Sequence, residues 1–180
     1  MSTRTLTLSP FSNDTAPEGI RIISKVTRES NVLAVQFLLT DPQSLVMMQT
    51  PATSPTRRDN LWQETCFEFF LSPQPSQAYW EFNLSPSGNW NVYHLDSYRQ
   101  GLRAELAFAD LPFFVKHSAH QFSLNIQIDL SPLVPIKQAI DLGITTVIKT
   151  KRGEITYWAL KHCGAKPDFH LRESFVATFS

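Results

Sequence analysis

The sequence contains little of what marks several protein classes. Two of its 180 residues are cysteine, Cys66 and Cys163. They are too few for a disulfide scaffold and too far apart for a zinc motif, so we expect reduced thiols unless the fold brings them together. No apolar stretch approaches the roughly 18 residues of a membrane-spanning helix, and the N-terminal residues lack the apolar core of a signal peptide. We therefore expect a cytoplasmic protein that does not contact the membrane.

Charge of either sign is scarce and balanced. Sixteen Lys and Arg offset sixteen Asp and Glu, and charged residues make up 18% of the chain, against roughly 25% in an average globular domain. Nucleic-acid binding requires a surplus of basic side chains, so the composition argues against it. The sequence also lacks a glycine-rich phosphate loop, a nucleophile elbow and an HExxH motif. We therefore expect a protein that is not an enzyme.

Aromatic and apolar side chains, by contrast, are plentiful and alternate with polar ones. The 13 Phe, 4 Tyr and 4 Trp, within 42% hydrophobic residues, suffice for a substantial core. From Gln121 to Leu130 apolar and polar side chains alternate, and this period of two predicts a strand with one buried face. Similar segments separated by turn residues predict further strands at 20–27, 31–40, 65–72, 78–85, 89–95, 144–150, 154–160 and 174–180.

This series of short strands predicts the fold class. We expect an all-β protein, an antiparallel β-sandwich of immunoglobulin or jelly-roll type, as one domain over residues 1–180. Residues 97–110 and 131–140 carry weak helical spacing and predict one or two short helices at the edge of the sandwich. Residues 1–15 are expected to form a loosely packed arm.

The predicted strands 65–72 and 78–85 fix the register of a central hairpin. Their apolar sides stay together if Phe67 and Phe69 share a face with Trp80 and Phe82. The opposite face then gathers Glu64, Glu68, Tyr79, Glu81 and Asn83. Such a face can bind a sugar, because rings stack on C–H surfaces while carboxylates and amides hydrogen-bond to hydroxyls. The alternative is a solvated face, neutralised by a cation from the set Arg57, Arg58, Arg99 and Lys161.

Three parts of the sequence resemble one known superfamily. They are the run DNLWQETCFEFFL (59–71), the strand and turn EFNLSPSG (81–88), and a C-terminal signature of YWALKH (157–162), KPDFH (166–170) and Phe175. These motifs resemble those of the DOMON-like superfamily, in its stand-alone bacterial branch related to family-nine carbohydrate-binding modules. The resemblance extends from Ile20 to the end of the chain.

The resemblance implies a β-sandwich that binds sugar or, in other branches, heme. In family-nine modules two aromatic side chains sandwich a terminal sugar unit, assisted by charged and amide groups. Trp62 matches the first of these aromatic residues by its place in the motif, and Glu68 matches the Glu that follows. The second Trp of the family has no identical counterpart here, and Phe169 or His170 lies in the corresponding C-terminal loop.

These observations together predict a non-catalytic module that binds a soluble carbohydrate by stacking and hydrogen bonding. The predicted ligand-binding residues are Trp62, Glu68, Glu81, Asn83, Arg99, Lys161, Phe169 and His170. Trp62 has an alternative role as a plug at the end of the sandwich. Trp90 and Tyr93 lie on opposite faces of their strand, so the one on the Phe82 side is expected to pack in the core.

Two other functions stay open at this stage. Glu68 and Glu81 on neighbouring strands have the residue types of an acid and a nucleophile in a glycoside hydrolase. A protein-interaction domain would instead bury these side chains and expose an apolar patch.

A bound cofactor is the remaining alternative to a plain sugar-binding module. Heme requires axial ligands, and the available pairs combine Met47 or Met48 with His162 or His170. His162, Cys163 and His170 lie close in sequence but lack a fourth metal ligand. Some relatives in the superfamily hold calcium. We expect no cofactor and no metal site, with heme and calcium as the alternatives.

Overall fold

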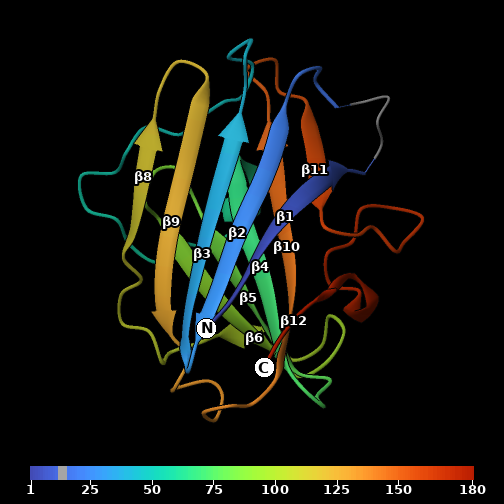
Figure 1. Cartoon of the computed structure of the whole chain (residues 1–180). Helices are drawn as coiled ribbons and strands as arrows, with labels where there is room; N and C mark the ends of the chain where they lie inside the picture. The colour runs from blue at the N-terminus through green and yellow to red at the C-terminus, as the bar shows by residue number, and fades with distance from the viewer. Residues whose placement is uncertain (12–15) are drawn as a thin grey trace.

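The computed structural model describes residues 1–11 and 16–180, and its elements are almost all strands (Figure 1). The strands are β1 (Ser2–Pro10), β2 (Arg21–Glu29), β3 (Val32–Thr40), β4 (Cys66–Pro73), β5 (Tyr79–Leu84), β6 (Trp90–Leu95), β7 (Arg103–Ala104), β8 (Phe113–His117), β9 (Gln121–Asp129), β10 (Ile140–Lys149), β11 (Ile155–Ala159) and β12 (Ala177–Phe179). Two single 3-10 turns, η1 (Leu61–Gln63) and η2 (Arg172–Ser174), complete the described elements. Within this part of the chain no helix has the length and apolar character needed to cross a membrane.

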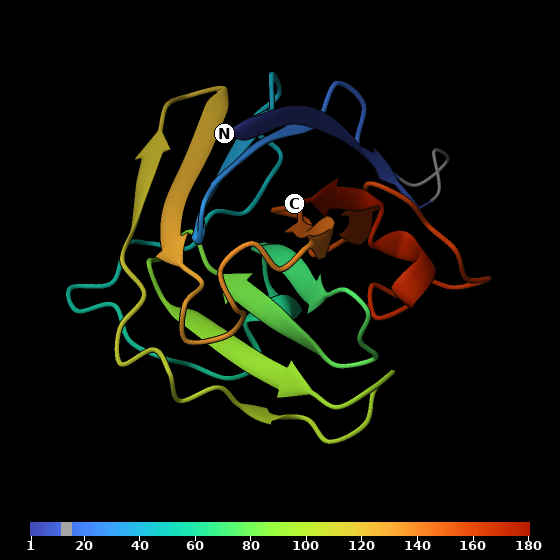
Figure 2. The same ribbon diagram turned by 60° about the horizontal axis from the view of Figure 1, so that its bottom comes forward.

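The strands form one antiparallel sheet that folds over into two layers (Figures 1 and 2). The front layer, which faces the viewer in Figure 1, contains β1, β2, β3, β9 and β8. The back layer contains β7, β6, β5, β4, β10 and β11, with β12 paired to β10. Strand β1 joins the layers, because Ser2–Leu8 pair with β2 while Ser9 and Pro10 pair with β11. The predicted antiparallel β-sandwich is confirmed.

The main core fills the space between the two layers. Alternation on the strands directs one set of side chains inward, as on β9, where Phe122 and Leu124 are buried and Gln121 is exposed. Phe67 of β4 stacks on Phe122 across the core, with ring centroids 4.9 Å apart. In the central hairpin Phe69 pairs with Phe82, which confirms the predicted register.

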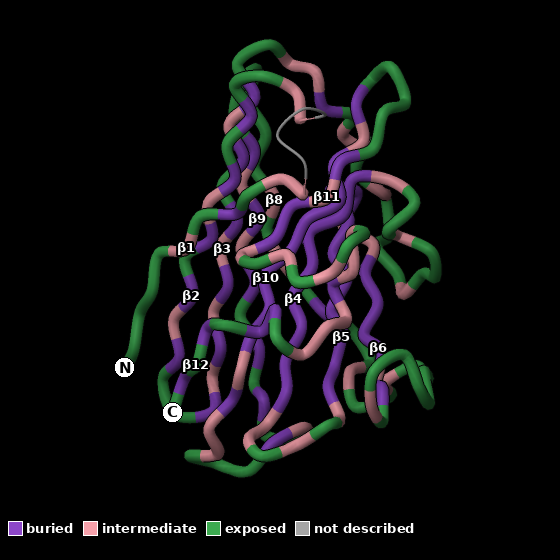
Figure 3. The backbone as a smooth tube through the Cα atoms, turned by 90° about the vertical axis from the view of Figure 1, so that its right-hand side faces the viewer, coloured by how far each residue is buried: buried purple, intermediate pink, exposed green. Residues whose placement is uncertain are grey.

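A second apolar cluster covers the outer face of the back layer, and we call it the outer cluster. Its buried members are Cys66, Phe70, Tyr79, Tyr93, Leu95, Val147, Ala159, Phe169 and Phe175. Phe169 and Phe175 belong to the C-terminal segment, residues 160–176, which lies against the back layer (Figure 2). Figure 3 shows the result: β4, β5 and β10 are buried along nearly their whole length. The alternative of a solvated face on the central hairpin is therefore wrong, because the C-terminal segment and its neighbours exclude water from it.

Gly143 on β10 allows the C-terminal segment to approach the sheet. A Cβ atom at this position would lie 2.9 Å from Cδ1 of Phe175. We expect Gly143→Ala to displace the Phe175 ring and to lower the free energy of unfolding by about 1–3 kcal/mol, measured by chemical denaturation. Adding Phe175→Leu should recover part of this loss, since the smaller side chain leaves room. A Gly143→Ala protein as stable as the wild type would contradict the close packing described here.

The two expected edge helices are not formed. In residues 97–110, Arg99 and Gly101 have φ values of 53° and 69°, in the left-handed region that right-handed helices do not use. This segment makes turns and the short strand β7 instead. In residues 131–140, Lys137 has a φ of 65° and the chain forms turns before β10.

The N-terminal residues also differ from expectation. Instead of a loosely packed arm, Ser2–Pro10 form β1, and residues 12–15 of that predicted arm lie outside the described residues. Only Leu8 of this strand is buried, so backbone pairing with β2 and β11 holds it in place. The sequence does not predict β8 either, because Phe113–His117 lacks an alternating pattern.

Candidate functional site

A cavity of about 340 Å³ opens on the outer face of the back layer, beside the C-terminal segment. Its lining residues are Trp62, Glu68, Phe70, Glu81, Leu95, Arg99, Leu102, Val147, Tyr157, Pro167, Phe169 and His170. Six of the predicted ligand-binding residues are among them, namely Trp62, Glu68, Glu81, Arg99, Phe169 and His170. The fold thus brings side chains from distant parts of the sequence into one cavity, and their binding of a ligand stays a prediction.

Two carboxyl groups form the floor of this cavity because of the hairpin register. Glu68 on β4 pairs with Asn83 on β5, and Phe70 pairs with Glu81. Glu68 and Glu81 are therefore diagonal neighbours on the same face of the sheet. Their exposed fractions are only 2% and 5%, so both carboxyl groups are almost entirely removed from bulk water.

The hydrogen bonds to this carboxyl pair are incomplete. The Asn83 amide donates to Oε1 of Glu81 at 2.8 Å, and the Thr145 hydroxyl donates to Oε2 of Glu68 at 3.3 Å. Oε1 of Glu68 is buried without a hydrogen-bond partner. Burial, followed by the charge of Glu81, raises the pKa of Glu68 to about 8. Burial also raises the pKa of Glu81, although Asn83 and then Arg99 oppose the rise.

His170 stands beside the carboxyl pair as a neutral ring. The Tyr79 hydroxyl accepts the Arg99 backbone N–H at 3.2 Å and lies 2.9 Å from Nδ1 of His170. The hydroxyl hydrogen is free to point at Nδ1, which leaves the ring proton on Nε2. The Nε2 atom lies 4.0 Å from Oε2 of Glu81. Burial, and then the charge of Arg99, lower the pKa of His170 to about 4, so the ring carries no charge at neutral pH.

The rim of the cavity is fixed by Asp168. Its carboxylate accepts hydrogen bonds from the Tyr98 hydroxyl at 2.7 Å, the Arg99 guanidinium at 2.9 Å and the His170 backbone N–H at 3.0 Å. Burial opposes ionisation of Asp168, but the bonds from Tyr98 and Arg99 lower its pKa below the ordinary value. The Arg99 charge is thereby paired at the rim and connects the loop after β6 to the C-terminal segment.

Trp62 supplies the accessible aromatic surface. It lies in η1 with 38% of its surface exposed. The edge of its ring contacts Tyr93, with ring centroids 5.9 Å apart. Tyr93 is itself fixed, because its hydroxyl donates to Asp59 at 2.6 Å and accepts from Asn91 at 2.8 Å. The indole is therefore held from below and available from the cavity side.

Phe169 contributes a wall rather than an open stacking face. Only 8% of its surface is exposed. Its ring meets Tyr157 and Phe70 edge to face, at centroid distances of 6.0 and 6.5 Å. Because it packs within the outer cluster, the expected sandwich of a ligand between Trp62 and Phe169 is weakened on the Phe169 side.

Two of the predicted residues do not line the cavity. Asn83 is fully buried below the floor and acts through its bond to Glu81. Lys161 is exposed and lies outside the cavity lining. The sequence missed Phe70, Leu95, Leu102, Val147, Tyr157 and Pro167. Alternation on β4 places Phe70 on the Glu68 face and was the one available signal, whereas the other positions depend on tertiary packing.

Arg57, one of the cations proposed to neutralise the site, has a structural role. Its guanidinium donates to Asn91 at 2.7 Å and to the Glu105 and Phe108 carbonyls at 2.8 Å each. It also lies over the Trp90 ring, 4.3 Å from the centroid.

Trp90, on the Phe82 side, is buried in the main core, and Tyr93 packs in the outer cluster.

We expect Arg57→Ala to destabilise the fold, since it leaves several part-buried acceptors without a donor. The expected loss is about 2–3 kcal/mol of unfolding free energy, measured by urea denaturation. The neighbouring Arg58 is exposed, so Arg58→Ala serves as the matched control and should change stability by less than about 0.5 kcal/mol. Equal effects of the two substitutions would contradict the role assigned to Arg57.

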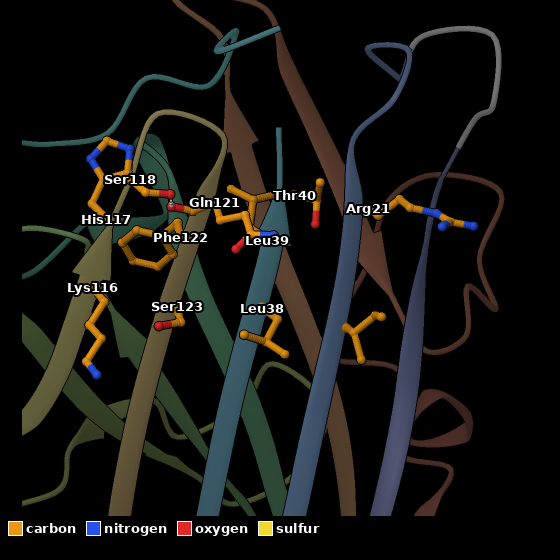
Figure 4. A pocket seen from close by; sticks show the side chains of 11 residues that line it. Arg21, Leu38, Leu39, Thr40, Lys116, His117, Ser118, Gln121, Phe122 and Ser123 are labelled. Atoms are coloured by element: carbon orange, nitrogen blue, oxygen red, sulfur yellow. Dashed lines mark hydrogen bonds between the residues drawn. The ribbon is translucent and has the colours of Figure 1, made fainter. Parts of the chain in front are cut away.

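A larger hollow, of about 500 Å³, lies on the outer face of the front layer (Figure 4). Its polar side chains include Arg21, Lys116 and Gln121, all of them exposed. These groups are hydrated. None of the buried, unpaired side-chain atoms found among the described residues belongs to the lining of this hollow. The smaller cavity, with its buried carboxyl pair, is therefore the stronger candidate site.

The predicted heme ligands do not all line one cavity. His170 lines the candidate site, whereas Met48 packs against the main core and lines a different cavity. Met47 is partly exposed, and Nε2 of His162 lies 2.9 Å from the Ser9 carbonyl oxygen. Cys66 and Cys163 are free thiols, buried and exposed respectively. Within residues 1–11 and 16–180, no group of three or more His, Cys, Asp or Glu side chains is placed to hold a metal ion.

Comparison with solved structures establishes what the chain is similar to. A candidate carbohydrate-binding protein from Bacteroides uniformis ATCC 8492 superposes with a TM-score of 0.69 at 11% sequence identity. The alignment covers 97% of this chain and 84% of that protein. The two proteins share a fold.

Other comparisons are weaker. A family 9 carbohydrate-binding module from Caldicellulosiruptor kristjanssonii, solved with glucose and with cellotriose, aligns over 80% of this chain at 15% identity. These alignments cover 69% and 67% of the module chains, with a TM-score of 0.49 in each case. No protein-family model and no curated protein sequence matches the chain. At such identities, structural likeness shows the fold and not the ligand.

Proposed function

We propose that the cavity on the back layer binds a small soluble carbohydrate and that the protein is not catalytic. One observation carries this proposal: a partly exposed indole, Trp62, and a buried hydrogen-bonding floor, Glu68 and Glu81, line the same cavity. A sugar ring presents an apolar C–H face and a hydroxyl-bearing edge. The indole can stack on the first while the carboxyl groups accept hydrogen bonds from the second.

The size and lining of the cavity agree with this ligand class. A volume of about 340 Å³ falls in the range of roughly 300–1,000 Å³ typical of small-molecule sites. Apolar walls from Leu95, Val147 and Phe169 surround the polar floor. Small-molecule sites commonly have this composition, in which a few polar groups set orientation and apolar surface supplies affinity.

The position of the two carboxyl groups favours binding over hydrolysis. A glycoside hydrolase places its acid and its nucleophile so that they flank the scissile bond. Glu68 and Glu81 instead lie side by side on one floor, with Asn83 and Thr145 bonded to them from within the sheet. A bound sugar would meet both groups from the same side.

Two further considerations support a soluble saccharide. The structural neighbour from Bacteroides uniformis is itself a candidate carbohydrate-binding protein. We also propose a cytoplasmic location, and in that compartment a soluble sugar is a more accessible ligand than an insoluble polymer. The cavity, rather than a long open groove, suits a single sugar unit or the end of a short chain.

The test is a screen of monosaccharides and short soluble oligosaccharides by thermal unfolding, followed by titration calorimetry. At a concentration about 100 times the Kd, a ligand stabilises the folded state by about 2.7 kcal/mol. For a chain of this size the unfolding temperature should rise by roughly 5–10 °C. Stabilisation that persists undiminished in Trp62→Ala, or the absence of any stabilising sugar, would refute the proposal.

A further inference from the structure

One oxygen atom of the buried carboxyl pair at the cavity floor has no hydrogen-bond donor within the protein. Only 2% of the surface of Glu68 is exposed. The residue lines the cavity, and its Oε1 atom has no hydrogen-bond partner. Most buried polar atoms in folded proteins are satisfied, and leaving one unsatisfied costs folding free energy. Glu68 lines the cavity, and a ligand that donates a hydrogen bond to its unpaired oxygen would satisfy that atom.

Arg99, the one guanidinium of the described lining, favours the ionised form of Glu81 but has no counterpart beside Glu68. The titratable or charged groups that share the cavity with Glu68 are Glu81, Arg99, Tyr157 and His170, and Cys66 lies two residues before Glu68 on β4. The Arg99 guanidinium is paired with Asp168 at the rim, 2.9 Å away, and His170 is neutral. The floor therefore holds two acidic groups, while the one guanidinium of the lining already has its own carboxylate.

The walls also favour a positive group. Aromatic rings from Trp62, Phe70, Tyr157 and Phe169 line the same cavity as the two carboxyl groups. The face of an aromatic ring carries negative potential and attracts cations, most strongly where water is excluded. A cavity that combines the accessible indole of Trp62 with a buried acidic pair has the chemistry of an ammonium-binding site.

We propose that the preferred ligand is an amino sugar, whose protonated amino group binds between Glu68 and Glu81 while its ring stacks on Trp62. This inference rests on the proposed function and names the ligand class within it. An ammonium group has three donors and no acceptor. It can satisfy Oε1 of Glu68, bond to Glu81 and allow both carboxyl groups to be ionised side by side. A hydroxyl supplies one donor and no charge.

The ionisation behaviour of the pair agrees with this proposal. Burial and the proximity of Glu81 raise the pKa of Glu68 to about 8, as expected for an acid that lacks a nearby cation. A bound ammonium group would supply that cation and stabilise both carboxylates in their charged form.

The experiment compares matched sugars by titration calorimetry at constant ionic strength. The probes are glucose, galactose and mannose, whose 2-hydroxyl matches an amino group in size but carries no charge, their 2-amino derivatives, and the corresponding N-acetyl derivatives, which lose the charge but carry a larger substituent. Ammonium chloride at the same concentration controls for salt. We expect at least one amino sugar to bind about 10- to 100-fold more tightly than its parent and its N-acetyl form, the effect typical of a hydrogen bond to a charged group.

Glu68→Gln provides the specific variant. The amide is close in shape to the carboxyl group, and the side chain is already largely uncharged in the free protein at pH 7, so the fold should be retained. We expect this variant to lose the preference for the amino sugar, so that the amino sugar and its neutral parent bind with similar affinity. Glu64→Gln is the matched control, because Glu64 lies outside the cavity, paired with Lys149, and it should leave the preference intact.

The outcomes separate this inference from the proposed function. Binding of neutral sugars with equal or weaker binding of the amino sugars overturns the inference and leaves the proposed function standing. Absence of binding by every sugar overturns both. An amino-sugar preference that survives in Glu68→Gln also overturns the inference, because the charge would then be recognised elsewhere.

Discussion

Replacing Trp62 with alanine should weaken saccharide binding roughly 10- to 100-fold while leaving the unfolding temperature within a few degrees of the wild type. The binding loss follows from removal of the stacking surface and of the water exclusion it provides over the floor. Stability should change little, because 38% of the Trp62 surface is exposed and the residue lies in a single 3-10 turn. Titration calorimetry and thermal unfolding of the same preparations measure the two effects.

A matched control distinguishes this result from a general effect of losing an aromatic residue. Phe114 is 76% exposed and lies on edge strand β8 of the front layer, away from the cavity. Phe114→Ala should therefore leave saccharide affinity unchanged. If Trp62→Ala instead unfolds the protein, Trp62 is a structural plug and the site has been assigned to the wrong residue.

The stability of the protein should fall as the pH rises from 6.5 to 8. Glu68 has a pKa raised from 4.5 to about 8 in the folded state, so between these values the folded protein binds a proton that the unfolded chain has released. The free energy of unfolding must then decrease with rising pH. Over the interval from pH 6.5 to 8 we expect a loss of about 1–2 kcal/mol, measured by urea denaturation at each pH.

This interval isolates the carboxyl pair from His170. The pKa of His170 is lowered from 6.5 to about 4, so its contribution increases stability between those values and is constant above pH 6.5. Glu81, with its pKa also raised, acts in the same direction as Glu68. Glu68→Gln should flatten the profile, whereas Glu64→Gln should keep the wild-type slope. A wild-type profile that is already flat would mean that Glu68 is ionised and stabilised by a group not identified here.

Strand periodicity predicted the architecture and the floor of the site. The alternation in β4 and β5 is strict, and only one register joins Phe69 to Phe82 without exposing apolar side chains. That register alone puts Glu68, Glu81 and Asn83 on a common face. Short-range pattern was sufficient here because the two strands are adjacent in sequence and connected by a short loop, residues 74–78.

The covering of that face could not be read from the sequence. Period-two alternation does not reveal whether the second face of a sheet meets water or another segment. The C-terminal segment contributes Phe169 and Phe175 from nearly a hundred residues beyond β4, and its own sequence has no regular period. As a result the carboxyl pair, which alternation alone leaves open to solvent, is buried, and burial raises the pKa of both Glu68 and Glu81.

Individual cations were the least predictable part of the site. Arg57, Arg58, Arg99 and Lys161 all carry a positive charge, and nothing in the sequence pattern shows which of them lies near the carboxyl pair. Tertiary structure separates them, since Arg57 lies over the Trp90 ring while Arg99 is positioned at the rim by Asp168. Left-handed backbone at Arg99 turns the loop after β6 toward the C-terminal segment, and helical spacing in this region concealed that turn.

The most direct test of the central claim is to follow the four tryptophan indole N–H signals by NMR while a saccharide is added. Trp80, Trp90 and Trp158 are buried in the main core, and the indole groups of Trp80 and Trp158 are bonded to Glu105 and Thr156. We predict that only the Trp62 signal shifts, with a concentration dependence that matches the calorimetric Kd. Saturable binding that leaves the Trp62 signal in place, or that shifts the core tryptophans instead, would contradict the claim that this cavity is the ligand site.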